Sequence, residues 1–83
     1  MKEITFDDFK TIVSDHLGID GKAIKNTSNF IEDFRIDSLS LVNFIIKLEL
    51  KLGIKISNEK LMEMTDMGKA VKIINEALLK KAM

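Results

Sequence analysis

Apolar residues recur every three or four positions along most of the chain, which is the spacing of one face of an α-helix. The first segment with this spacing covers residues 5–17. Its apolar positions are Phe6, Phe9, Val13 and Leu17. Thr5 precedes them and has a side chain that caps helix starts, while Gly18 follows them as a helix-ending glycine does. The pattern therefore predicts a first helix between Thr5 and Gly18.

Residues 18–37 show no sustained period. They contain Gly21 and a polar run over residues 26–29, so we predict a loop of about twenty residues. A loop of this length is unusual in so short a chain unless it is functional or contains a small packed piece. Four apolar residues in its second half are expected to attach it to the core: Phe30, Ile31, Phe34 and Ile36.

Residues 38–52 form the most apolar helical segment, with two apolar stripes on one helix. The first stripe contains Leu41, Ile45, Leu48 and Leu52. The second stripe lies roughly 135° away around the helix and contains Leu39, Val42, Ile46 and Leu50. One stripe is enough to pack a surface helix on a small core. The second is either buried in a compact bundle or left exposed as a recognition face for partners.

Two further helices are predicted after Gly53, which ends the apolar segment. Ser57 or Asn58 can cap a short helix of about two turns, and Thr65 or Asp66 can cap the last helix. The buried face of the last helix is expected at Met67, Val71, Ile74 and Leu78. The pattern thus predicts an all-α fold: a small four-helix bundle with three main helices, one short helix and a long loop between the first two.

Composition excludes several classes of function. The chain has no cysteine, so it has no disulfides, no thiolate nucleophile and no cysteine-ligated metal, and a reducing cytoplasm is favoured. No apolar stretch is long enough to span a membrane, and the N-terminus has no apolar signal core. At 83 residues we expect a single domain over residues 1–83.

The net charge of zero hides an asymmetry, because residues 1–40 carry −3 and residues 41–83 carry +3. Neither half is basic enough for a nucleic-acid surface, and no aromatic residues are interleaved with the lysines. His16 is the only histidine, so a histidine-based metal or catalytic site is not expected. We therefore expect no catalytic and no metal-binding residues. The methionines Met62, Met64 and Met67 are expected to fill the core or, alternatively, to shape an adaptable pocket for an acyl chain.

Ser38 stands at the start of the second predicted helix, in the stretch "DFRIDSLSLVNF". The unpaired N–H groups and the dipole at a helix start favour an attached anion. By local rules alone, however, a serine here is a helix cap.

The residues on both sides of Ser38 form an arrangement that extends well beyond a helix cap. The tripeptide Asp37-Ser38-Leu39 is preceded by "NFIEDFRI", with a phenylalanine and an acidic pair. It is followed by "LELKLGIKIS" and then by "MTDMGKAVKII". In this arrangement, which runs without gaps over residues 29–74, the sequence resembles the acyl carrier proteins. These are small four-helix domains that carry acyl groups as thioesters on a phosphopantetheine arm.

The resemblance implies that Ser38 accepts 4′-phosphopantetheine from coenzyme A through a phosphopantetheinyl transferase (a holo-acyl-carrier-protein synthase), while Asp37 and Leu39 help to position the site. The chain would be a cytoplasmic, monomeric carrier and not an enzyme. Its partners would be acyl-activating, condensing or acyltransferase enzymes. The residues expected to face them are Leu39, Val42, Asn43, Ile46 and Lys47. Three others match core or pocket-lining positions: Ile45, Leu48 and Leu52.

Two departures from the family pattern favour a specialised carrier of fatty-acid, lipid or polyketide-type synthesis; the alternative is a housekeeping carrier whose surface charge has drifted. Ser40 and Asn43 stand where acids are common on the recognition helix, with Lys47 and Lys51 further along, so docking to basic partner surfaces should weaken. Arg35 stands where the family commonly has glycine, which often permits a backbone angle that arginine adopts reluctantly, so the turn before Ser38 is expected to differ slightly from the family's. Its side chain either pairs with the phosphodiester or is solvated.

Two alternatives remain open from the sequence. A carrier of the same fold can hold an aminoacyl, peptidyl or D-alanyl group, and cargo is not readable from these residues. An unmodified helical module would keep the fold only for protein–protein contacts.

Overall fold

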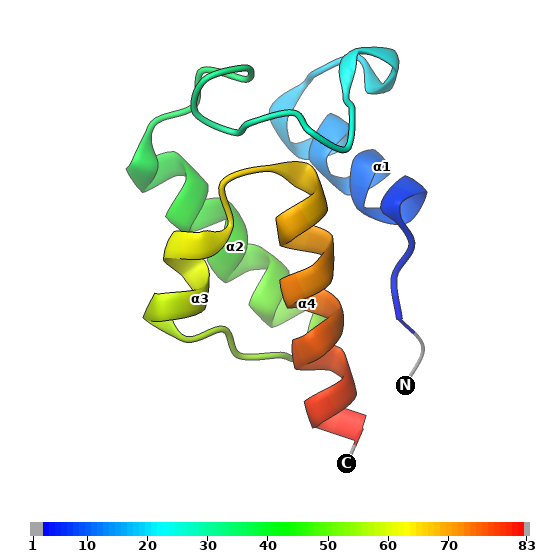
Figure 1. Ribbon diagram of the computed structural model, residues 1–83, viewed down its shortest axis with the longest axis vertical. Coiled ribbons are helices and arrows are strands. Elements are labelled where there is room, and N and C mark those ends of the chain that lie inside the picture. The colour runs from blue at the N-terminus through cyan, green and yellow to red at the C-terminus, as the bar shows by residue number, and fades with distance from the viewer. Residues whose placement is uncertain (1–2, 83) are drawn as a thin grey trace.

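The computed structural model describes residues 3–82. The helices in chain order are α1 (Phe6–Leu17), the short 3₁₀ helix η1 (Gly21–Ala23), α2 (Ser38–Leu52), α3 (Asn58–Glu63) and α4 (Met67–Ala82). Three long helices and the short α3 surround one core, and the connection from α1 to α2 runs over one end of the bundle (Figure 1). The predicted all-α bundle is confirmed for the described residues.

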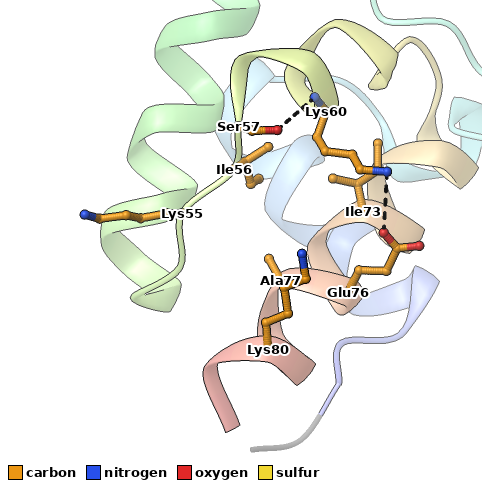
Figure 2. Close-up of a pocket in the computed structure, with 8 residues that line it drawn as sticks. All are labelled: Lys55, Ile56, Ser57, Lys60, Ile73, Glu76, Ala77 and Lys80. Carbon is orange, nitrogen blue, oxygen red and sulfur yellow. Dashed lines mark hydrogen bonds and ion pairs between the residues drawn. The ribbon is translucent and has the colours of Figure 1, made fainter. Parts of the chain in front are cut away.

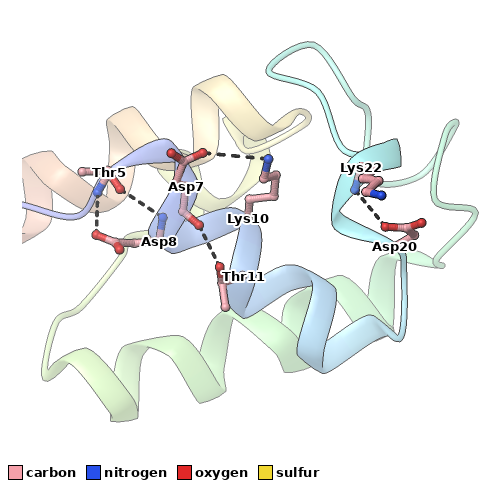
Figure 3. Close-up of polar contacts among 7 residues, drawn as sticks. All are labelled: Thr5, Asp7, Asp8, Lys10, Thr11, Asp20 and Lys22. Carbon is pink, nitrogen blue, oxygen red and sulfur yellow. Dashed lines mark hydrogen bonds and ion pairs between the residues drawn. The ribbon is translucent and has the colours of Figure 1, made fainter.

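The predicted ends of α1 are also confirmed. The Thr5 hydroxyl accepts from the Asp8 N–H, and the Asp8 carboxylate accepts from the Thr5 N–H, which is a reciprocal capping box (Figure 3). Asp7 and Asp8 occupy the first turn, where the helix dipole favours acids. Gly18 ends α1 at φ 69°, a left-handed angle that glycine adopts without strain.

The core lies where α1, α2 and α4 meet. Phe9 of α1 packs edge-on against Phe30, with 6.4 Å between the ring centroids. It also packs against Phe44 of α2 in a tilted arrangement, with 6.3 Å between the centroids. The first stripe of α2 faces this core: Leu41, Ile45 and Leu48 are buried, and Leu52 packs partly buried against them. His16 is exposed, with its ring 4.7 Å from that of Phe44.

The long connection contains a small packed piece, as its length suggested. After η1, Ile24 and Ser28 are buried, and the connection caps the start of α4 with main-chain carbonyls. The N–H of Met67 donates to the Ser28 carbonyl at 3.0 Å, and that of Gly68 donates to the Asn26 carbonyl at 2.9 Å. The connection between α1 and α2 is therefore hydrogen-bonded to the start of α4.

Two expectations about burial are wrong. Phe30 is fully buried and Phe34 and Ile36 are partly so, but Ile31 is 47% exposed and does not attach the loop to the core. Met64 is buried, whereas Met62 on α3 is 81% exposed and does not fill the core. Both side chains instead line a groove on the surface.

The remaining helix starts follow the alternatives offered by the sequence. Ser57 caps α3, since its hydroxyl accepts from the Lys60 N–H at 3.2 Å. The Asp66 carboxylate accepts from the Lys69 N–H at 2.9 Å at the start of α4. Gly53 ends α2 at φ 65°.

Candidate functional site

Asp37, and not Ser38, caps α2. Asp37 has extended backbone angles, and its carboxylate accepts from the Ser40 N–H at 2.7 Å. Ser38 is the first residue of the helix and is exposed. Interpreting Ser38 as the cap was therefore wrong by one residue. Its hydroxyl makes no hydrogen bond within the described residues, so the helix start does not need it.

The start of α2 is electrostatically suited to an anion on Ser38. The N–H groups of Ser38 and Leu39, in the first turn, donate no hydrogen bond within residues 3–82. The backbone N–H of Ser40, and then its side chain, hold the pKa of Asp37 below its usual value of 3.8. Asp37 therefore stays ionised and keeps the cap closed at neutral pH.

A groove of about 410 Å³ opens beside Ser38. The 29–32 turn, the start of α2 and the segment 61–65 line it through Asn29, Ile31, Glu32, Ser38, Leu41, Val42, Leu61, Met62 and Thr65. Ile31 and Met62, which the sequence placed in the core, are groove residues. The sequence positions of Ile31 and Met62 do not show whether they line a groove or lie in the core, because both places take apolar side chains.

The three residues expected at core or pocket-lining positions lie in the core or against it, which confirms the first of these two places. Ile45 and Leu48 are buried in the core, and neither they nor Leu52 lines the groove beside Ser38. On α2 that lining comes from Leu41 and Val42.

The second stripe of α2 is exposed along most of its length. Leu39 is 70% exposed, Ile46 46% and Leu50 80%, while Val42 is half-buried between them. Asn43 and Lys47 are exposed beside this stripe. An exposed apolar stripe of this kind is typical of an interaction surface.

Arg35 adopts a left-handed backbone angle, with φ 57°, although its side chain was expected to change the turn at this point. It is the only non-glycine residue with positive φ among residues 3–82, and its side chain is exposed. The turn before Asp37 therefore keeps a conformation suited to glycine, at a cost in backbone strain.

No cluster of histidine and acidic side chains is placed to hold a metal ion in residues 3–82. None of the described helices is long and apolar enough to cross a membrane.

Comparisons with known proteins agree with this geometry. Residues 7–74 match the family model described as the phosphopantetheine attachment site. The chain is 39% identical over 70 residues to the acyl carrier protein of Chlamydia muridarum, covering 84% of this chain and 91% of that one. It is 43% identical over 65 residues to the acyl carrier protein of Campylobacter jejuni subsp. doylei, covering 75% and 84%.

A solved structure of the acyl carrier protein from Enterococcus faecalis superposes with a TM-score of 0.72 at 28% identity, covering 87% of this chain and 91% of that one. The fold and the site thus define a helical domain for attachment of phosphopantetheine. The chain belongs to the acyl carrier protein family, and the cofactor of that family is phosphopantetheine.

Proposed function

We propose that Ser38 is the attachment residue, and that the chain carries acyl groups in a specialised fatty-acid, lipid or polyketide-type pathway. The observation that carries this proposal is the state of the Ser38 hydroxyl. It is exposed, it is free of the capping role taken by Asp37, and it stands at a helix start beside an apolar groove. An anionic phosphodiester is favoured at that position.

The residues present fit a phosphopantetheine group. Ser38 would hold it through its oxygen, the first-turn N–H groups would face its phosphate, and Leu41, Val42 and Leu61 offer apolar surface beside it. When bound, the group supplies the terminal thiol that this cysteine-free chain lacks, and that thiol holds an acyl chain as a thioester.

The proposed role is delivery, not catalysis. A tethered acyl group reaches a partner's active site at a raised effective concentration without any catalytic residue on the carrier. We infer a single domain over residues 1–83 that works as a monomer in the cytoplasm, where the absence of cysteine is ordinary.

We further propose that the exposed stripe of α2 is the partner surface, with Leu39, Val42 and Ile46 as apolar contacts and Asn43 and Lys47 beside them. The charge of α2 supports partner enzymes whose docking surfaces are not basic. Glu49 is the one acid within residues 38–52, and it is half-buried, with its carboxylate accepting from the Ile56 N–H at 2.8 Å. The charges left on α2 are lysines, which favour a partner surface rich in carboxylates.

The decisive experiment is modification in vitro. The purified chain is incubated with coenzyme A and a phosphopantetheinyl transferase, and its intact mass is measured. We expect the wild type to gain one phosphopantetheinyl group and Ser38→Ala to gain none. Ser40→Ala, a matched control on the same helix turn, keeps the backbone N–H that Asp37 binds and should be modified like the wild type.

Two results would contradict the proposal. A mass gain that persists in Ser38→Ala would place the attachment elsewhere. Failure of the folded wild type to be modified by transferases that load other carriers would favour the unmodified interaction module.

A further inference from the structure

A second groove, of about 440 Å³, lies between residues 55–60 and the second half of α4 (Figure 2). It shares no lining residue with the groove beside Ser38. The short helix α3 stands between the two, giving Lys60 to one and Leu61 and Met62 to the other. A molecule bound in the second groove would therefore not occupy the site of the arm.

The floor of this second groove is apolar. Ile73 is buried, and Ile56 and Ala77 pack partly buried against the core. In Figure 2 the side chains of Lys60 and Lys80 extend along the groove near Ile73 and Ala77, while Lys55 extends away from its edge. The groove thus combines an apolar floor with ammonium groups at its rim.

The charge of this face is strongly one-sided. Together with the adjoining hollow over α3 and α4, it is lined by five lysines and two glutamates: Lys55, Lys60, Lys69, Lys72, Lys80, Glu63 and Glu76. Both glutamates lie within ion-pair distance of Lys60, at 3.8 Å for Glu63 and 4.0 Å for Glu76. The other four lysines form no ion pair within residues 3–82. The face is therefore left with an excess of positive charge.

The shape of the groove selects the kind of occupant. Binding to a flat bilayer surface uses apolar side chains that project from a protein. Here the apolar atoms lie at the bottom of a hollow, so the occupant has to bring a projecting apolar side chain of its own. Its charge has to be negative on both sides of that side chain to complement the lysines.

We propose that this groove is a second docking surface, for a segment of a partner protein that carries aliphatic side chains flanked by carboxylates. The proposal does not rest on the assignment of Ser38. It predicts that a partner can be held at α3 and α4 while α2 and the arm stay free.

The test is an NMR titration of the whole chain, labelled with nitrogen-15, in its unmodified and its phosphopantetheine-loaded forms. The probe is an acetylated, amidated hexapeptide with two central leucines flanked on each side by two glutamates. We expect saturable shifts centred on the amides of Ile56, Ile73 and Ala77, with equal affinity for both forms of the chain. Peptides with the leucines changed to serines, or the glutamates to lysines, should bind much more weakly.

Matched variants separate this site from general charge attraction. The double variant Lys55→Glu/Lys80→Glu should weaken binding by about tenfold, because it reverses the rim charge without breaking an ion pair. Lys22→Glu/Lys25→Glu makes the same change in net charge on the connection after α1 and should leave the affinity unchanged. Ala77→Phe should abolish binding by filling the floor, with circular dichroism confirming the fold.

Three outcomes would overturn the proposal. Equal weakening by the two double variants would reduce the effect to net charge. Shifts centred outside the groove would place the binding elsewhere. Capture of the wild type by phosphatidylglycerol vesicles, lost in Lys55→Glu/Lys80→Glu and accompanied by no response to the peptide, would make this face a membrane-binding surface.

Discussion

At the scale of single residues, the turn before Asp37 contains the clearest backbone strain in the described chain. Arg35 sits at φ 57°, where the side chain of an L-residue crowds its own backbone. Within residues 3–82, no contact of the exposed Arg35 side chain explains this backbone angle. The backbone angle is set by its neighbours, since Phe34 and Ile36 pack against the core on either side.

Replacing Arg35 by glycine should stabilise the protein. Relief of the left-handed strain gains about 1–2 kcal/mol, and the greater freedom of glycine in the unfolded chain returns part of it, leaving about 0.5–1 kcal/mol. The unfolding midpoint in urea measures this gain. Arg35→Ala keeps the Cβ and should show no such gain, so equal stabilisation by both variants would assign the effect to the lost charge.

The cap residue Asp37 should make stability depend on pH. Hydrogen bonding from Ser40 lowers the folded-state pKa of Asp37 below 3.8, so the ionised carboxylate adds stability above that value. This contribution is lost as the pH falls below 3.8 and through the folded-state pKa. We expect wild type to exceed Asp37→Asn in unfolding free energy at neutral pH, and the difference to shrink on acidification. A difference that stays constant in urea titrations across this range would contradict the assignment.

At the scale of elements, α2 buries one apolar stripe and exposes most of the other. Leu48 lies on the buried stripe, whereas Leu50, two positions along, lies on the exposed one. The same substitution should therefore have very different effects at the two positions.

Leu48→Ala should cost about 2–4 kcal/mol, because it leaves a cavity in the core. Leu50→Ala should change the unfolding free energy by less than about 0.5 kcal/mol, because it removes a side chain that is already in water. Chemical denaturation of the two variants gives both values. A loss of similar size at Leu50 would show that the outer stripe is covered in solution.

Much of the element scale was predictable from sequence, and the failures have specific causes. The helix-ending glycines Gly18 and Gly53 and the inner stripe of α2 follow from local rules. The start of α2 at Ser38 was also predicted, but local rules alone favoured Ser38 as its cap, because Asp37 and Ser38 are both good capping residues and are adjacent. The groove beside Ser38 was missed because its walls come from three separate segments, and local periodicity carries no information about how such segments meet.

At the scale of the whole molecule, hydrogen bonds join the segment before α1 to the middle of α4. The Ile4 N–H donates to the Asn75 side-chain oxygen at 2.8 Å, and the Asn75 side-chain nitrogen donates back to the Ile4 carbonyl at 3.0 Å. These residues lie 71 positions apart, so no local pattern predicts the pair. The amide fixes the entry to α1 against the middle of α4.

Asn75→Ala should lower the free energy of unfolding by about 1–2 kcal/mol, since it removes two half-buried hydrogen bonds. The Ile4 amide should also exchange its hydrogen faster, which hydrogen-exchange NMR resolves. Lys72→Ala, an exposed change on the same helix, is the control and should alter neither quantity. Unchanged exchange at Ile4 in Asn75→Ala would mean that the tie does not hold the N-terminal segment.

The capping of α2 by Asp37 has a consequence for mixtures of loaded and unloaded chains. Since the Ser38 hydroxyl takes no part in the fold, a chain without the arm keeps the same exposed stripe on α2. On the proposed function, such a chain would occupy partner enzymes without delivering anything. A Ser38→Ala copy expressed beside the wild type should then act as a dominant-negative inhibitor, in proportion to its abundance.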